Sequence, residues 1–112
     1  MGFIQIIDVT TSRIDEIEAL ADQLRTETAG ITTARKSTVT QDRDRPNHYL
    51  VMVEFDSYES AMKNSSNPAT QAFAAKLAEL CDAPPSFTNL DVYRVTEIGS
   101  IDITEKAKAK TS

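Results

Sequence analysis

The sequence of 112 residues has little of several residue types: one cysteine, one histidine, three glycines and no tryptophan. A single cysteine, Cys81, excludes an intramolecular disulfide. One Cys and one His also exclude a zinc site built from such ligands, so only carboxylates are left and we expect no metal or other cofactor. The chain has no glycine-rich phosphate loop, which argues against nucleotide chemistry.

Positive charge is also scarce: the chain has 12 Lys and Arg but 17 Asp and Glu, so its net charge is −5. Nucleic-acid binding depends on neutralising phosphates with a basic surface, so we expect neither a nucleic-acid partner nor an anionic membrane partner. No basic flank precedes a long apolar run, and no apolar run approaches the length of a membrane span. These absences predict a cytoplasmic protein.

The length suits one compact domain, and the hydrophobic share of 40% is sufficient for a modest core. We assign residues 1–96 to this domain. The composition changes after Thr96, and residues 97–112 are predicted to be a tail with one short β-like piece at 101–104.

Four segments are predicted to be strands. Residues 3–9 and 49–55 carry apolar side chains on both alternating faces, as central strands covered on both sides do. Residues 31–41 are rich in threonine and carry charges, and residues 87–95 mix apolar with polar side chains. Polar and charged strands are typical of sheet edges.

The first predicted helix has apolar residues recurring from Ile14 to Thr28 within an arc of about 120°, the width of a core-facing stripe. Thr11 or Ser12 is the expected N-cap, with Asp15 in a capping-box position. Gly30 is expected to end the helix.

Two further helices are predicted after the second central strand. Residues 58–64 form a short helix with Ser57 as its N-cap. The other begins at Pro68, where Asn67 is the N-cap and proline suits the first turn. Pro84 and Pro85 end it.

The order strand, helix, strand, strand, helix, strand predicts an α+β, ferredoxin-like βαββαβ fold with an antiparallel four-stranded sheet and helices on one face. The central strands are apolar on both sides, so the uncovered face would present a larger apolar patch than a soluble monomer tolerates. Two sheets packed face to face would cover it. We therefore predict a homodimer with two-fold symmetry.

The second half of the chain resembles the antibiotic biosynthesis monooxygenase-like family of dimeric α+β barrels. The resemblance is carried by a strand ending in Glu, a turn, a short helix containing an Ala, and an Asn-Pro followed by an aromatic residue. These residues are Val53, Glu54, Phe55, Ser57, Ala61, Met62, Asn67, Pro68, Gln71, Ala72 and Phe73. The resemblance implies a ferredoxin-like homodimer and a cofactor-independent monooxygenase.

The sequence departs from this family at several positions. Phe55 stands where the family has a Trp at the end of the strand, and the His that the family often has in the short helix has no counterpart here. In the haem-degrading branch, an Asn, a Trp and a His act at the positions of Ile7, Asn64 and Ala74. Since all three identities differ, the sequence argues against haem degradation.

His48 and Glu54 are the candidate catalytic residues. His48 is the one side chain with an ordinary pKa near neutrality, but its position after Pro46 and Asn47 suits a solvated hairpin residue better than a base. Glu54 lies inside an apolar strand, where burial would raise its pKa and make it a base. Pairing of Glu54 with an arginine across the sheet is the commoner outcome.

A substrate pocket is predicted between the short helix and the sheet. Its candidate residues combine hydrogen-bonding groups with an apolar wall, as small-ligand sites do, and are Tyr58, Asn64, Asn67, Phe73 and Tyr93. Simpler roles exist for some of them, because Asn67 caps a helix and Phe73 suits the core. Cys81 lies on an apolar helix face and is expected to be an inert thiol.

Two functions of different classes remain open. One is a cofactor-independent monooxygenase-like protein acting on a small aromatic or polyketide-like molecule, in which the deprotonated substrate itself activates O₂, as the resemblance implies. The alternative is a non-catalytic dimeric module that binds a small hydrophobic metabolite, which the missing His and Trp favour.

Overall fold

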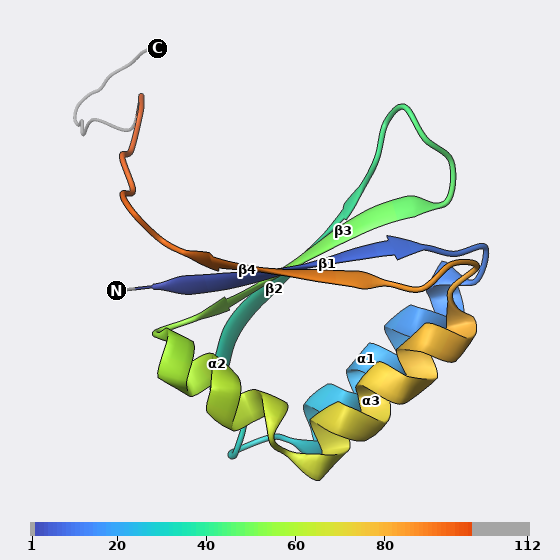
Figure 1. Ribbon diagram of the computed structural model, residues 1–112, viewed down its shortest axis with the longest axis horizontal. Helices are drawn as coiled ribbons and strands as arrows, with labels where there is room; N and C mark the ends of the chain where they lie inside the picture. The colour runs from blue at the N-terminus through green and yellow to red at the C-terminus, as the bar shows by residue number, and fades with distance from the viewer. Residues whose placement is uncertain (1, 100–112) are drawn as a thin grey trace.

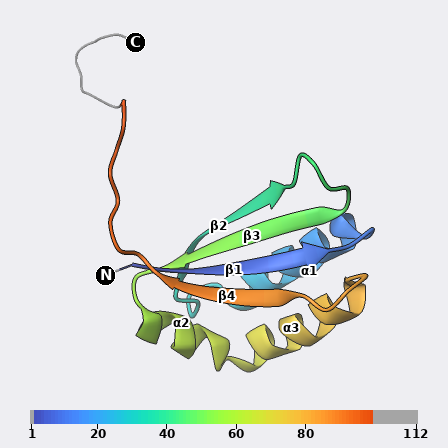
Figure 2. The same cartoon turned by 45° about the horizontal axis from the view of Figure 1, so that its top comes forward.

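The computed structural model describes residues 2–99 and has the predicted order of strands and helices. Four strands form one antiparallel sheet in the order β2-β3-β1-β4. Figures 1 and 2 show the helices together on one face of this sheet. The elements are β1 (Phe3–Thr10), α1 (Ile14–Glu27), β2 (Ala34–Gln41), β3 (His48–Phe55), α2 (Tyr58–Ser65), α3 (Pro68–Leu80) and β4 (Ser86–Asp91). The α+β, ferredoxin-like prediction is confirmed, with β1 and β3 in the centre.

The core lies between the sheet and the helices. Alternation along β1 turns Phe3, Ile7 and Val9 toward the helix layer. Ile7 and Val9 pack with Ile17 of α1 and Leu77 of α3, whereas Phe3 belongs to a second cluster near α2. The apolar stripes of α1 and α3 therefore cover one face of the sheet, as their periodicity predicts.

The opposite face of the sheet also carries large apolar side chains. Ile6 pairs with Met52 across β1 and β3, and Ile4 and Leu50 occupy the same alternating positions. The described helices all lie on the other face (Figure 1). We call the surface formed by Ile4, Ile6, Leu50 and Met52 the open face. The homodimer that would cover it remains a prediction.

The helix starts agree with the sequence in two of three cases. Ser57 caps α2 by accepting from Ser60 N, and Asn67 caps α3 by accepting from Ala69 N. The predicted cap of α1 is wrong, because Arg13 occupies the N-cap position without a side-chain cap. The hydroxyl of Thr11 instead donates to the carbonyl of Leu80 at 2.7 Å, which ties the start of α1 to the end of α3.

Both edge strands are shorter than predicted. β2 begins at Ala34, because the chain first turns through Thr28, whose carbonyl accepts from Ile31 N at 3.0 Å. β4 ends at Asp91, and Figure 1 shows the following segment leading away from the sheet. The predicted β-like piece at 101–104 lies outside the described residues, and the domain boundary at 96 remains a prediction. Within residues 2–99, no helix has both the length and the apolarity to cross a membrane.

Candidate functional site

A cavity of about 850 Å³ lies between the sheet and the helix layer. Its apolar wall comes from β1, β3, α1 and α3 and includes Ile7, Val9, Ile17, Leu24, Val51, Val53, Phe55, Phe73 and Leu77. Pockets of 300–1,000 Å³ with mainly apolar walls are typical of small-molecule sites. The sequence placed the pocket against the short helix, but most of its helical wall comes from α1 and α3, with only Asn64 and Ser65 from α2.

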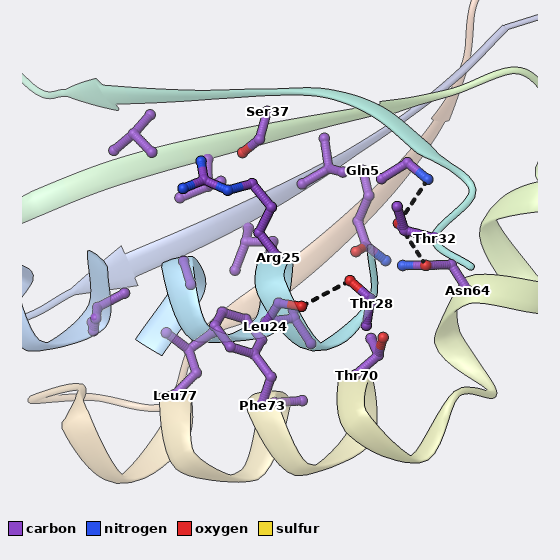
Figure 3. Close-up of a pocket in the computed structure, with 18 of the residues that line it drawn as sticks. Gln5, Leu24, Arg25, Thr28, Thr32, Ser37, Asn64, Thr70, Phe73 and Leu77 are labelled. Atoms are coloured by element: carbon purple, nitrogen blue, oxygen red, sulfur yellow. Dashed lines mark hydrogen bonds between the residues drawn. The ribbon is translucent and has the colours of Figure 1, made fainter. Parts of the chain in front are cut away.

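Polar side chains gather at the end of the cavity next to α2, as Figure 3 shows. Gln5 reaches down from β1, and its Nε2 donates to Asn89 Oδ1 at 3.2 Å. The hydroxyl of Thr28 donates to the carbonyl of Leu24 at 2.8 Å. Asn64 accepts from Thr32 at 3.2 Å through Oδ1, so its amide N–H groups remain available as donors. We call this region, with Thr70, the polar end.

The charged residues that line the cavity are exposed and come from α1 and β2, so we place the entrance between these two elements. They are Glu18, Asp22, Arg25, Arg35 and Lys36. Several are paired: Arg25 lies 3.2 Å from Asp22, and Arg35 Nε donates to Asp56 at 2.9 Å. The hydrogen bond from Arg35 lowers the pKa of Asp56, so this pair is ionised at neutral pH.

The predicted substrate-binding residues divide into two groups. Asn64 and Phe73 line the cavity, on opposite sides of the polar end. Tyr58, Asn67 and Tyr93 do not line it. Tyr58 packs edge-on against Phe3, and Tyr93 lies beyond β4 with 91% of its surface exposed. A binding role for these three residues stays a prediction.

His48 does not fit the solvated position expected of it, because it is only 5% exposed. Its Nδ1 lies 2.7 Å from Asp42 Oδ2 and its Nε2 lies 2.9 Å from Asp8 Oδ1. Ionised carboxylates only accept hydrogen bonds, so the doubly protonated imidazolium satisfies both contacts. The prediction failed because sequence distance hides the Asp8 contact, which β1 and β3 create by pairing.

This cluster shifts the pKa values of its members. The hydrogen bond to Asp42, followed by that to Asp8, raises the pKa of His48. The pKa of Asp42 is lowered by the backbone N–H of Asp44 and then by His48. His48 lies on the same sheet face as Leu50 and Met52, opposite the cavity. It therefore ties the β2–β3 hairpin to β1, away from the cavity.

Glu54 is also on the open face and does not line the cavity. Its partner is Lys36 at 4.0 Å and not the arginine expected from the sequence. Cross-strand register explains this, since Lys36 of β2 stands opposite Glu54. Cys81 ends α3 half-buried, and burial, followed by the charge of Asp82, raises the pKa of its thiol, as expected of an unreactive cysteine.

The polar residues at the cavity that were not predicted as site residues include Gln5, Thr28 and Thr70. A signal existed for Gln5, which shares the alternating face of Phe3, Ile7 and Val9 and is therefore a polar residue turned toward the core. Thr28 was recognised only as part of the apolar stripe of α1. Among residues 2–99, no group of three or more His, Cys, Asp and Glu is arranged to hold a metal ion.

Comparison with known proteins gives matches at the level of structure. No protein-family model matches the chain, and no curated protein matches it. A mutant form of SnoaB, a cofactor-independent oxygenase from Streptomyces nogalater, superposes with a TM-score of 0.71 and 14% identity over 84% of this chain and 95% of that one. Rv0793 from Mycobacterium tuberculosis has a TM-score of 0.69 and 16% identity over 87% and 100%.

A further solved structure, named an antibiotic biosynthesis monooxygenase, has a TM-score of 0.64 and 13% identity over 84% of this chain and all of the other. Identities at this level show a shared fold and leave the activity to be argued from the site. The chain therefore has the fold of the antibiotic biosynthesis monooxygenases.

Proposed function

We propose that this protein is a cofactor-independent, monooxygenase-like protein that takes a small aromatic, oxygen-bearing molecule into the cavity. The cavity itself carries the proposal, since it combines a volume of about 850 Å³ with an apolar wall and a few polar groups at one end. Such a composition suits planar, mainly apolar ligands with one or two oxygen substituents. The shared fold with a cofactor-independent oxygenase supports the oxidative reaction.

In the proposed reaction the substrate supplies the electrons. A phenol or anthrone loses a proton, and the anion reduces O₂. In an anthrone, one oxygen atom converts the methylene to a carbonyl, and the other leaves as water with the two methylene hydrogens. In a phenol, one oxygen atom replaces the ring hydrogen opposite the hydroxyl to give a quinone, and the other leaves as water with that hydrogen and the hydroxyl hydrogen. Hydrogen-bond donors at the polar end would stabilise the anion, and Asn64 offers amide N–H groups there.

The second candidate is a non-catalytic module that binds the same class of molecule. It is favoured by the placement of the titratable residues. His48 and Glu54 lie on the opposite sheet face, and the charged residues that line the cavity are exposed at its entrance. Within the described part of the chain, no His, Asp or Glu side chain is thus held inside the cavity as a general base.

Oxygen uptake separates the two candidates. The protein is incubated with anthrones and hydroquinones while an oxygen electrode follows O₂ and ligand fluorescence follows binding. Protein-dependent O₂ consumption supports the monooxygenase, binding without consumption supports the binding module, and absence of binding rejects both. Ala74→Trp, which fills the cavity, is expected to abolish binding and turnover. Ala75→Trp is the matched control, because Ala75 is exposed and does not line the cavity.

We further propose that the protein is a homodimer paired through the open face. Burying Ile4, Ile6, Leu50 and Met52 would remove an apolar patch from water. The segment after β4 supports this, since Tyr93, Val95 and Ile98 are 91%, 78% and 89% exposed. Light scattering at micromolar concentration is expected to give twice the chain mass. A stable monomer would refute the dimer. The cytoplasmic location also stays a prediction, which cell fractionation would check.

A further inference from the structure

Arg25 is a cation at the entrance of the cavity to which the proposed function gives no role. It lies in the last turn of α1 and lines the cavity. Figure 3 shows its side chain extending from α1 toward β2, the strand that carries Ser37. A ligand that enters between α1 and β2 therefore passes this guanidinium.

The charged residues at the entrance are ordered along its length. Glu18 and Asp22 precede Arg25 on α1, which ends beside the polar end, so Arg25 is the closest of the three to that end. Lys36 of β2 is on the same side, because its partner in β3 directly precedes the end of that strand and α2 follows. The cations thus lie toward the polar end, which favours an anionic group of the ligand on this side.

Two of the cations that line the cavity are engaged by acids outside it. Arg35 donates to Asp56 from Nε, at 2.9 Å, and also from Nη2. Lys36 Nζ lies 4.0 Å from Glu54, which is on the open face. Neither Asp56 nor Glu54 lines the cavity. Both cationic side chains therefore bind partners that a ligand in the cavity does not contact.

Arg25 differs, because its partner is a residue of its own helix that also lines the cavity. Its Nη2 lies 3.2 Å from Asp22, and the two side chains are 79% and 69% exposed. An exposed pair three residues apart on a helix contributes little to stability, so Arg25 can exchange Asp22 for a ligand group at little cost. A guanidinium has five N–H donors, so donors remain for a ligand even while Asp22 is bound.

We propose that Arg25 binds a carboxylate of the ligand at the entrance and so selects aromatic acids over neutral aromatic molecules of the same shape. The aromatic ring enters the apolar part of the cavity, and the carboxylate stays at the entrance, where the planar guanidinium offers two parallel N–H donors. Because this position remains open to water, the carboxylate avoids the cost of full burial. The inference rests on the proposed ligand-binding function of the cavity.

The test compares 1-naphthoate and 1-naphthamide, which have the same shape and differ in charge, on wild type and Arg25→Gln. Because the chain has no tryptophan, the fluorescence of the naphthalene ring reports binding directly. We expect the affinity for 1-naphthoate to fall about three- to tenfold, between the effects of losing an exposed ion pair and a charged hydrogen bond. The affinity for 1-naphthamide is expected to change less than about twofold, since it forms no ion pair. Added salt should weaken the binding of 1-naphthoate to wild type and leave that of 1-naphthamide unchanged.

Two further variants complete the experiment. Arg25→Lys keeps the charge without the planar fork, and its loss of affinity for 1-naphthoate is expected to be smaller than that of Arg25→Gln. Arg43→Gln is the matched control, because it removes the same charge from an exposed residue that does not line the cavity. It is expected to leave both affinities unchanged. Thermal melts check folding, since a cation in the last turn of a helix also complements the helix dipole, a role that does not depend on the charge of the ligand.

The outcomes separate the inference from the proposed function. If neither naphthalene compound binds wild type, the cavity is not a ligand site and both are wrong. If 1-naphthamide binds wild type and 1-naphthoate does not, only the role of Arg25 is overturned. The same holds if Arg25→Gln weakens both ligands equally, or if Arg43→Gln weakens 1-naphthoate as much as Arg25→Gln does.

Discussion

Replacing Leu77 by alanine tests whether the helix layer packs on the sheet as described. Leu77 is 2% exposed and forms one buried cluster with Ile7, Val9 and Ile17, which come from β1 and α1. It is thus the fully buried residue of α3 in this cluster, beside the partly buried Phe73 and Leu80. It also lines the cavity, although little of its side chain is uncovered.

The expected loss follows from these contacts. Removing three buried carbons costs about 2.4 kcal/mol at roughly 0.8 kcal/mol for each. Leu→Ala substitutions in cores cost about 2.7–5.0 kcal/mol once the new void is included. Because Leu77 borders the cavity, its truncation enlarges an existing space and does not seal a new one, and we expect the lower part of this range, about 2.7–3.5 kcal/mol. For a domain of this size the melting temperature would fall by roughly 10–25 °C.

Urea denaturation followed by circular dichroism measures this loss, at equal protein concentration because association would contribute to stability. Ile31→Ala is the control, since Ile31 is 61% exposed and its truncation is expected to cost less than about 0.5 kcal/mol. A loss below about 1 kcal/mol for Leu77→Ala would mean that α3 does not close the core through this residue. Other residues would then have to close the cavity on the side of α3.

Two further predictions concern the open face and its histidine. Met52→Glu places a charge in the proposed interface and is expected to shift the dimer to monomer, since an unpaired buried charge is costly. Light scattering measures the mass, and an unchanged dimer contradicts the proposed interface. The chain has one histidine, so proton NMR follows a single imidazole. Its pKa is expected to lie above 6.5 in wild type and to be lower in Asp42→Asn. A wild-type pKa at or below 6.5 contradicts the hydrogen bonds from His48 to Asp42 and Asp8. With a raised folded pKa, the stabilisation by His48 is complete below pH 6.5 and is lost as the pH rises through the folded value. The difference in melting temperature between wild type and His48→Gln should therefore shrink as the pH rises.

Much of the fold was predictable because it follows from local patterns in the sequence. Apolar residues on both faces of residues 3–9 and 49–55 identified the two central strands, and charges identified the edges. Asn67 and Ser57 were predicted as caps because they directly precede helical segments. Each of these signals depends on neighbours within a few positions, which a sequence displays directly.

The site was only partly predictable. Asn64 and Phe73 line the cavity, and they were predicted because they combine a hydrogen-bonding group with an apolar wall; their binding role stays a prediction. Thr28 and Thr70 gave no signal, because only the packing of α1 beside α3 brings them to one cavity. The burial of His48 was not predicted, because its partner Asp8 lies 40 positions away along the chain.

The sequence alone thus determined the order of elements and the two-sided central strands. These follow from composition and from the period of the hydrophobic pattern. Only the tertiary structure decided that the polar residues divide between two faces of one sheet, with His48 and Glu54 on one and the cavity on the other. Strand pairing and helix packing bring together residues that are distant in the chain, and the chemistry of a cavity depends on that proximity.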